Sequence, residues 1–403
     1  MILNTNDEAV SALLRWRKNK LKFDVIKTVS RHQQTIISVD KKFRSLTGET
    51  IMPFYIASDF HAHQQTVAWC DTETGETQIT TLKHNLEQVR VFYASLPPGI
   101  VGVEASSKAR WFEDLLEETG HQLVVGNPVL IRRRATSRHK SDRRDAELIL
   151  QLLLRDEFPA IWRRSREQTQ VLEILKLRHS LVCQRTQVYN RLQALAKSCG
   201  LGKARTRTAA FQERFKASDL DEVEALQRSQ LLQLIGNFDG QLKELDKWLA
   251  KRAALDPQVQ LLVTQPGVGN LTALALVNSL GDISRFTHPT KQVPAYFGLD
   301  PLEKESAGKR QAAGTSRAGS AITRFLLGQA AQSAARRDPQ LKAFYKRLAK
   351  KKPKGVAKTA VARKLLIKLV IMLRDAITAE EFDRRGGTSG GGSKSSWIER
   401  SVV

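Results

Sequence analysis

The stretch FYIASDFHAHQQTVAWC, residues 54–70, decides the fold of this chain. Its two runs of strand-forming residues, at 54–59 and 65–70, predict two consecutive β-strands. A turn at 72–75, which contains Thr, Glu and Gly, separates the second of them from a third strand predicted at 77–82. The folded region therefore begins with a sheet made of three successive strands.

Elements downstream of this stretch alternate between helix and strand. The sequence predicts a helix at 84–95, an apolar strand at 100–103 that ends at Glu104, a second helix, a short strand at 122–125 and a closing helix at about 141–155. Successive strands followed by alternating helices and strands are typical of a mixed sheet covered by helices on both faces. The fold class predicted for residues 52–160 is therefore α/β.

The rest of the chain has the pattern of helices. Leucines recur at helical spacing on both sides of a glycine-containing break, which predicts a long helical hairpin over 161–255. Such a hairpin either packs only on itself or forms a coiled coil with another chain. A mostly helical domain rich in Gly, Lys and Arg is predicted at 256–380. An N-terminal extension at 1–51 and a flexible Gly- and Ser-rich tail at 381–403 flank these domains.

The charge balance indicates a polyanionic partner. The 403 residues include 65 Lys and Arg against 41 Asp and Glu, which gives a formal net charge of +24 at pH 7. A surplus of this size suits binding to nucleic acid. The same surplus in a protein without a polyanionic partner would promote non-specific binding.

Cysteine spacing and hydropathy indicate the cellular setting. Cys70, Cys183 and Cys199 lie far apart and lack the spacing of a zinc site or a disulfide framework, which suits a reducing compartment. No apolar run approaches the length of a membrane span, and the first residues lack the layout of a signal peptide. We therefore expect a cytoplasmic, nucleoid-associated protein that has no membrane partner.

Four acidic residues fall where a sheet and a helix can bring them together. Asp59 ends the first strand and Glu104 a later one, while Asp142 and Asp145 lie three residues apart on the closing helix and so face one side of it. Two-metal cleavage of a phosphodiester needs several carboxylates around ions roughly 3.5–4 Å apart. By themselves, Asp142 and Asp145 would only suit a helix start. The four acids together predict a divalent-metal site.

Basic residues and histidines surround these acids. Lys140, Arg143 and Arg144 would contact phosphates and supply the salt-dependent part of nucleic-acid affinity. His61 and His63 alternate just after Asp59. With no third ligand nearby in the sequence, we interpret them as polar residues beside the site rather than as ligands.

Two further segments suit contact with a phosphate. A Pro-Gly-x-Gly turn joins two predicted helices and would present the backbone N–H groups of Gly267 and Gly269 at a helix N-terminus, although an ordinary helical corner has the same pattern. A later Ser/Gly-rich segment offers three serines, Ser306, Ser316 and Ser320, that chemistry alone does not distinguish as nucleophiles. Nearby cations would offset the charge on a pentavalent phosphorus: Lys309, Arg310, Arg317 and Arg324.

The order of these motifs resembles the DEDD insertion-sequence transposases, the IS one-ten family, also described as bridge-RNA-guided recombinases. The match spans roughly residues 54–375. It is carried by Asp59, VEA at 103–105, KSDRRDA at 140–146, PGVG at 266–269, GL at 298–299, SAGK at 306–309, Gly314, Gly319 and Arg324.

The resemblance implies a RuvC-like, RNase H-fold domain, a coiled-coil insertion and a C-terminal transposase domain. It implies that Mg²⁺ (or Mn²⁺) is bound by Asp59, Glu104, Asp142 and Asp145, and that Ser306 forms a 5′-phosphoserine intermediate with DNA. It further implies donor and target DNA as substrates and a structured bridge RNA as guide. The expected assembly is a homo-oligomer, from dimer to tetramer, in which the acids of one protomer act with the serine of another.

Two other functions fit part of the pattern. A RuvC-like nuclease that hydrolyses DNA with metal-activated water needs only the acids and no serine. A basic scaffold that only binds nucleic acid would show salt-sensitive binding and no cleavage. Four acids placed in so basic a chain favour an enzyme, because acidic groups repel a polyanion unless they hold a metal.

Overall fold

The computed structural model describes residues 54–105, 110–135, 141–201, 207–306 and 309–386, with the backbone alone at 303–313. The chain divides into two compact units, and the boundary lies between Arg163 and Arg164. The predicted N-terminal extension lies outside the described residues, as does most of the predicted tail.

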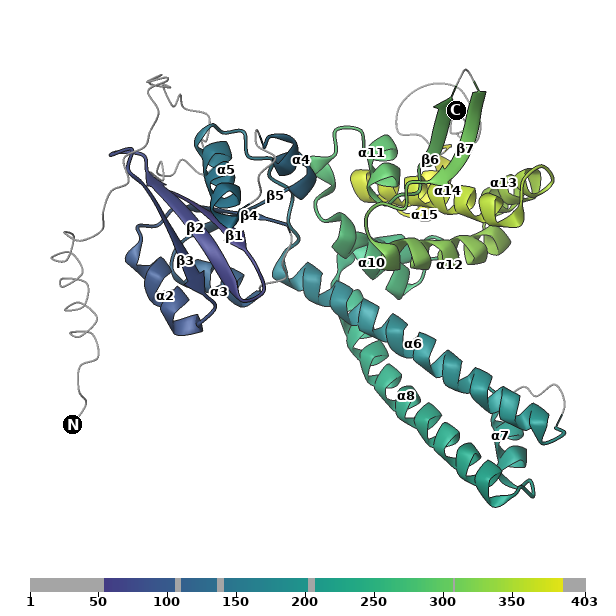
Figure 1. Ribbon diagram of the computed structural model, residues 1–403. Helices are drawn as coiled ribbons and strands as arrows, with labels where there is room; N and C mark the ends of the chain where they lie inside the picture. The colour runs from purple at the N-terminus through teal and green to yellow at the C-terminus, as the bar shows by residue number, and fades with distance from the viewer. Residues whose placement is uncertain (1–53, 106–109, 136–140, 202–206, 307–308, 387–403) are drawn as a thin grey trace. The chain divides into compact units, whose positions relative to one another are not determined.

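The first unit is built on a five-stranded mixed sheet with the strand order β3-β2-β1-β4-β5 (Figure 1). Strands β1, β2 and β3 pair antiparallel, whereas β4 lies parallel to β1 and β5 parallel to β4. The predicted mixed sheet is therefore confirmed. Its strands are β1 (Phe54–Phe60), β2 (Gln64–Asp71), β3 (Thr77–Lys83), β4 (Ile100–Glu104) and β5 (Gln122–Gly126).

Helices cover both faces of this sheet, because side chains alternate along each strand. Ile56 and its neighbours on one face pack on α2 (Leu86–Ser95) and α3 (Arg110–Glu118). Ala57, on the opposite face, packs with residues of α4 (Pro128–Arg133) and α5 (Asp142–Leu154). Helix α2 begins two residues later than the sequence predicts, because the Asn85 side chain accepts hydrogen bonds from the next turn and caps the helix.

The buried side chain of His121 ties the first unit together. Its Nδ1 accepts a hydrogen bond from the Gly99 backbone N–H at 3.2 Å, so its Nε2 carries the proton that reaches the Tyr93 carbonyl at 2.9 Å. This neutral tautomer satisfies both ring nitrogens within the core.

We expect acid to destabilise the first unit through His121. Burial lowers the pKa of His121 below its usual value, against the opposing effect of its hydrogen bonds to Tyr93 and Gly99. The neutral form therefore stabilises the fold above a pH of about 6.5, the ordinary histidine pKa, and this contribution is lost as the pH falls through the folded pKa. Thermal unfolding between pH 7.5 and 5 measures the effect. His121→Gln, which cannot gain the proton, should show a weaker pH dependence over that interval, and an equally steep dependence would contradict the assignment.

The second unit begins with a helical hairpin. Helices α6 (Arg166–Ser198) and α8 (Glu222–Leu255) lie antiparallel, with α7 (Ala209–Lys216) between them in sequence (Figure 1). Two arginine–aspartate pairs, Arg178–Asp246 and Arg185–Asp239, join the middle of the two long helices. The base of the hairpin belongs to the main core of the unit, and its tip has a separate apolar cluster around Leu192.

A helical bundle forms the remainder of the second unit. Its main core joins the base of the hairpin to the later helices. A two-stranded antiparallel hairpin interrupts this region, and the sequence analysis did not predict it. The elements are α9 (Pro257–Val263), α10 (Asn270–Leu280), a 3-10 turn (Ile283–Arg285), α11 (Pro289–Tyr296), β6 (Pro301–Ser306), β7 (Lys309–Thr315), α12 (Ala321–Arg337), α13 (Pro339–Ala349), α14 (Lys354–Asp375) and α15 (Ala379–Arg384).

A buried ion pair lies inside this bundle. Lys368 of α14 is 1% exposed, and its ammonium group donates to Asp338 at 3.3 Å and to Asp383 at 2.8 Å. Asp338 also caps α13 by accepting from the backbone of Gln340 and Leu341. These bonds satisfy charges that would otherwise be costly to bury.

Candidate active site

Strand β1 places Asp59 on the face of the sheet that α5 covers. Ala57, two residues earlier, packs with residues of α5, and side chains two apart on a strand share a face. Asp59 is 7% exposed, so its carboxylate lies at the edge of the core rather than in open solvent. Asp59 is therefore an acidic residue that faces α5 from the end of the first strand.

Helix α5 brings Asp142 and Asp145 to the same face. Ser141 caps the helix by accepting a hydrogen bond from the Arg144 backbone N–H, so both acids stand in the first turn. Acids at this end of a helix are favoured by the helix dipole. The first turn of α5 therefore presents acidic groups toward the end of β1.

Asp59, Asp142 and His61 form a compact cluster. One carboxylate oxygen from each aspartate and one ring nitrogen of His61 all lie within 4.8 Å of one another. The His61 Nε2 lies 3.0 Å from Asp59 Oδ2 and 3.5 Å from Asp142 Oδ1. His61, interpreted from the sequence as a polar residue beside the site, thus contacts both acids and is a further candidate ligand. Oxygen and imidazole donors at this spacing suit a divalent transition metal or Mg²⁺.

Glu104 lies next to this cluster along the sheet. The register pairs Ser58 with Val103, so Asp59 and Glu104, the next residues of two parallel neighbouring strands, occupy adjacent positions. The Glu104 carboxylate lies 3.6 Å from the Arg132 guanidinium, and Glu104 is not part of the three-residue cluster. Because the Arg132 side chain is 73% exposed, this exposed ion pair is weak and leaves Glu104 available to another cation.

The surroundings of Asp59 disfavour its ionised form when no cation is bound. Burial raises the pKa of Asp59, His61 opposes that rise, and the charges of Asp145 and Asp142 add to it. Asp145 thus lies close enough to act on Asp59, although it is outside the three-residue cluster. A bound divalent cation would relieve this repulsion.

A cavity of about 870 Å³ opens beside Asp142. Its lining combines threonines of β2 and β3 with Arg143, whose guanidinium lies 3.2 Å from Glu147. Of the other cations predicted to contact phosphates here, Arg144 is exposed and Lys140 lies outside the described residues. The acids therefore border a space that is polar and large enough for a substrate group. The threonines are Thr66, Thr77, Thr80 and Thr81.

The predicted glycine turn lies between α9 and α10 in the second unit. Gly267 abuts α12, because a Cβ added to it would lie 2.4 Å from the Ala334 backbone nitrogen. Helix packing thus accounts for this glycine. Gly269 is exposed at the N-terminus of α10, and a Cβ there would meet no atom within 4 Å. An open helix N-terminus at Gly269 suits the predicted contact with a phosphate.

The three candidate serines differ in their surroundings. The Ser316 hydroxyl donates to Asp300 at 2.8 Å, and Ser320 caps α12. Local hydrogen bonds therefore occupy both of them. Ser306 is the last residue of β6 and pairs across the hairpin with Lys309, at the end of the hairpin where the chain turns. The three serines, alike in sequence, are thus distinguished by their positions in the fold.

The predicted basic residues of this module differ as well. Arg317 is exposed, whereas the Arg324 guanidinium donates to the Phe297, Ala318 and Gly319 carbonyls and so stabilises the loop before α12. The Lys309 and Arg310 backbones belong to β7. Arg324 therefore has a structural role that the sequence pattern did not reveal.

Together, the mixed sheet, the acidic cluster and the adjoining polar cavity suit a class of protein: enzymes that hold a divalent cation with carboxylates. Comparison with known proteins narrows this class. Residues 56–200 match the family model of the DEDD transposases of the IS110 type, and residues 259–346 match that of the transposase IS116/IS110/IS902 family. The two matched segments cover more than half of the chain.

Individual relatives agree with these family matches. The transposase for insertion sequence element IS1111A of Coxiella burnetii is 28% identical over 304 residues, which cover 74% of this chain and 81% of that protein. The transposase for IS1328 of Yersinia enterocolitica is 27% identical over 68% of this chain and 80% of the relative. A probable family 20 transposase of Pseudomonas aeruginosa is 26% identical over 69% and 84%.

The chain belongs to the IS110 family of DEDD transposases and is thus an enzyme that cleaves and rejoins DNA. In the part of the chain that the structure describes, no helix has both the length and the apolar character needed to cross a membrane.

Proposed function

We propose that this transposase cleaves and rejoins donor and target DNA with a Mg²⁺-binding acidic site and a serine nucleophile. The observation that carries the proposal is the clustering of Asp59, His61 and Asp142 beside a polar cavity. Glu104, at the neighbouring position of β4, and Asp145, one turn along α5 from Asp142, would complete the ligand set. The mixed sheet with helices on both faces supports the assignment of a RuvC-like, RNase H-fold domain.

Mg²⁺, or Mn²⁺ in its place, would offset the negative charge that builds on the phosphorus during transfer. Asp59, Asp142, Asp145 and Glu104 would hold it, with His61 as a further ligand or as an orienting partner of Asp59. Arg143 and Arg144, on the first turn of α5, would hold the flanking phosphates.

Ser306 is the proposed nucleophile. Its Oγ–P bond forms as the P–O3′ bond of the DNA breaks, the hydroxyl loses its proton, and the leaving 3′ oxygen takes one up. Its place as the last residue of β6, paired across the hairpin with Lys309, supports this role. Because the acids belong to the first unit and Ser306 to the second, the proposal includes pairing of the two groups across protomers of a dimer or tetramer.

A structured noncoding RNA is the proposed guide for target and donor choice. The net charge of +24 supports binding of RNA as well as DNA. Base pairing by such an RNA would supply the sequence specificity.

Trapping of a covalent adduct tests the nucleophile. The full chain with DNA that carries an element end, its co-purified RNA and Mg²⁺ should give a protein–DNA adduct that survives denaturation. A label at the 3′ end of the cleaved strand should travel with the protein and a 5′ label should not, because a 5′-phosphoserine retains the downstream strand. EDTA and Ser306→Ala should each abolish the adduct, while the matched control Ser316→Ala should retain it.

The same experiment separates the proposal from simple hydrolysis. Cleaved DNA without any adduct would show a RuvC-like nuclease that uses water, and an adduct in Ser306→Ala would place the nucleophile elsewhere. Ribonuclease treatment before the assay should abolish strand exchange if an RNA guides the enzyme. Exchange at an undiminished rate after that treatment would remove the RNA from the proposal.

A further inference from the structure

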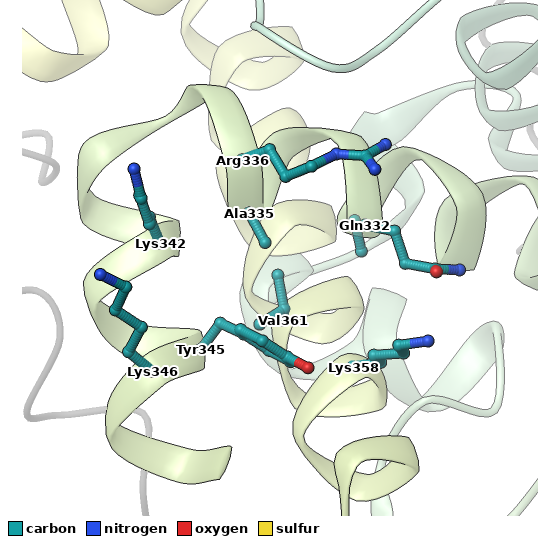
Figure 2. A pocket seen from close by; sticks show the side chains of 9 residues that line it. Gln332, Ala335, Arg336, Lys342, Tyr345, Lys346, Lys358 and Val361 are labelled. Carbon is teal, nitrogen blue, oxygen red and sulfur yellow. The ribbon is translucent and has the colours of Figure 1, made fainter. Parts of the chain in front are cut away.

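A second cavity, of about 400 Å³, lies among helices α12, α13 and α14 (Figure 2). Its floor is apolar, with Ala331 and Ala335 from α12 and Val361 from α14. The half-buried ring of Tyr345 on α13 packs against the main core and forms one wall. A flat aromatic wall over an aliphatic floor suits a flat, partly apolar ligand.

Four cations line this cavity: Arg336, Lys342, Lys346 and Lys358. All four are exposed, and their side chains form no ion pair or hydrogen bond with any of the residues that the structure describes. No acidic residue is among the residues that line the cavity. This contrasts with Lys368 in the same bundle, which two aspartates neutralise.

The cations that line the cavity come from three helices. Lys342 and Lys346 lie one turn apart on the same side of α13, Arg336 lies near the end of α12, and Lys358 comes from α14 (Figure 2). Cations that line one cavity without an acidic residue among them favour the binding of an anion there. The Gln332 amide adds a donor and an acceptor at the lining.

We infer that this cavity binds one unstacked nucleotide of a single-stranded nucleic acid, with the base against Tyr345 and the adjoining phosphates on the four cations. Aromatic stacking of a base beside a cationic track is how proteins hold single strands. A duplex keeps its bases paired and stacked and so presents only phosphates to the cavity. The inference rests on the proposed function, because strand exchange requires that unpaired strands be held.

Fluorescence anisotropy of the full chain with a labelled oligothymidylate of about twelve nucleotides tests the cations. EDTA is present throughout, so the result does not depend on Asp59 or Ser306. Arg336→Ala should weaken binding and reduce the slope of log affinity against log salt concentration by about 0.7, the value for one lost phosphate contact on a single strand. Arg337→Ala, one residue further along α12 and outside the cavity, is the matched control. It should leave the affinity and its salt dependence unchanged. Equal effects of the two variants would overturn the inference.

A second measurement tests the stacking on Tyr345. In an oligothymidylate with one 2-aminopurine, the fluorescence should be quenched on binding, because the base stacks on the ring. Tyr345→Phe should preserve this quenching. Tyr345→Leu, which keeps an apolar side chain, should abolish it and weaken binding by roughly five- to a hundredfold.

Competing probes complete the test. An oligouridylate should compete with the labelled strand if the cavity accepts either sugar, and a failure to compete would restrict the ligand to DNA. A duplex of the same length should compete poorly. If the duplex competes equally and Tyr345→Leu binds as the unchanged protein does, the cavity takes a phosphate alone and the inference of a bound base is wrong.

Discussion

Replacing Asp59 with asparagine should slow Mg²⁺-dependent strand cleavage by at least about a thousandfold, since charge stabilisation by a bound metal is worth several kcal/mol and each 1.4 kcal/mol is tenfold in rate. The Asp59→Asn side chain can still hydrogen-bond to His61, but it supplies no charge to hold a cation. Cleavage of labelled DNA measured over a range of Mg²⁺ concentrations gives the size of the loss.

Stability measurements distinguish this loss from misfolding. Burial and the neighbouring acids raise the pKa of Asp59, so its ionised form is costly to the metal-free fold. Asp59→Asn should therefore unfold at the same temperature as the unchanged protein or at a higher one, as is common when functional charge is removed. Glu117→Gln, on the exposed face of α3, is a matched control that should change neither the cleavage rate nor the unfolding temperature. Normal cleavage by Asp59→Asn would place the catalytic metal elsewhere.

Replacing Lys368 with methionine should lower the free energy of unfolding of the second unit by about 3–5 kcal/mol, the usual cost of breaking a buried ion pair by removing one partner. Asp338, 4% exposed, would keep its charge with only the backbone of α13 and the Gln265 amide as donors. Lys354→Met, at the exposed start of α14, is the matched control and should change stability by less than about 0.5 kcal/mol. Urea unfolding followed by circular dichroism measures both.

A double variant separates the charge from the packing. Lys368→Met with Asp338→Asn removes both charges of the pair whose two members are buried, so it should recover part of the stability that Lys368→Met loses. Burial alone would raise the pKa of Asp338, but the Leu341 backbone N–H and the Lys368 ammonium hold it below its usual value. The contribution of this pair is thus present above a pH of about 4, the ordinary aspartate pKa, and is lost in stronger acid. An equally large loss in the double variant would show that packing, not charge, is responsible.

Much of the first unit could be predicted from sequence because its elements carry strong periodic signals. Strand β1 alternates between two buried faces, and Ser141 marks the start of α5, so Asp59 and Asp142 could be placed on facing elements. The role of His61 could not, because it depends on the path of the turn after β1, which brings the ring back toward both acids. Its closeness to Asp59 in the sequence was the available signal.

The second unit was less predictable, for different physical reasons. Strands β6 and β7 form an isolated two-stranded hairpin of mostly polar residues, so the alternation of apolar residues that marks a buried strand is missing. The lysines and arginine around Tyr345 come from three helices, and only the packing of those helices brings them to one cavity. In sequence they read as part of a general basic surplus.

The two ends of the α6–α8 hairpin belong to separate apolar clusters, and ion pairs help to join the stretch between them. Arg178 and Arg185 are seven residues apart, as are Asp246 and Asp239, so two ion pairs join the helices on either side of the buried Leu242. Because the cluster around Leu192 is separate from the main core, we expect it to open at a lower free-energy cost than the base of the hairpin. Salt screens partly exposed charges, so it should weaken the Arg178–Asp246 and Arg185–Asp239 pairs. The stability of the far end of the hairpin should thus decrease as ionic strength rises.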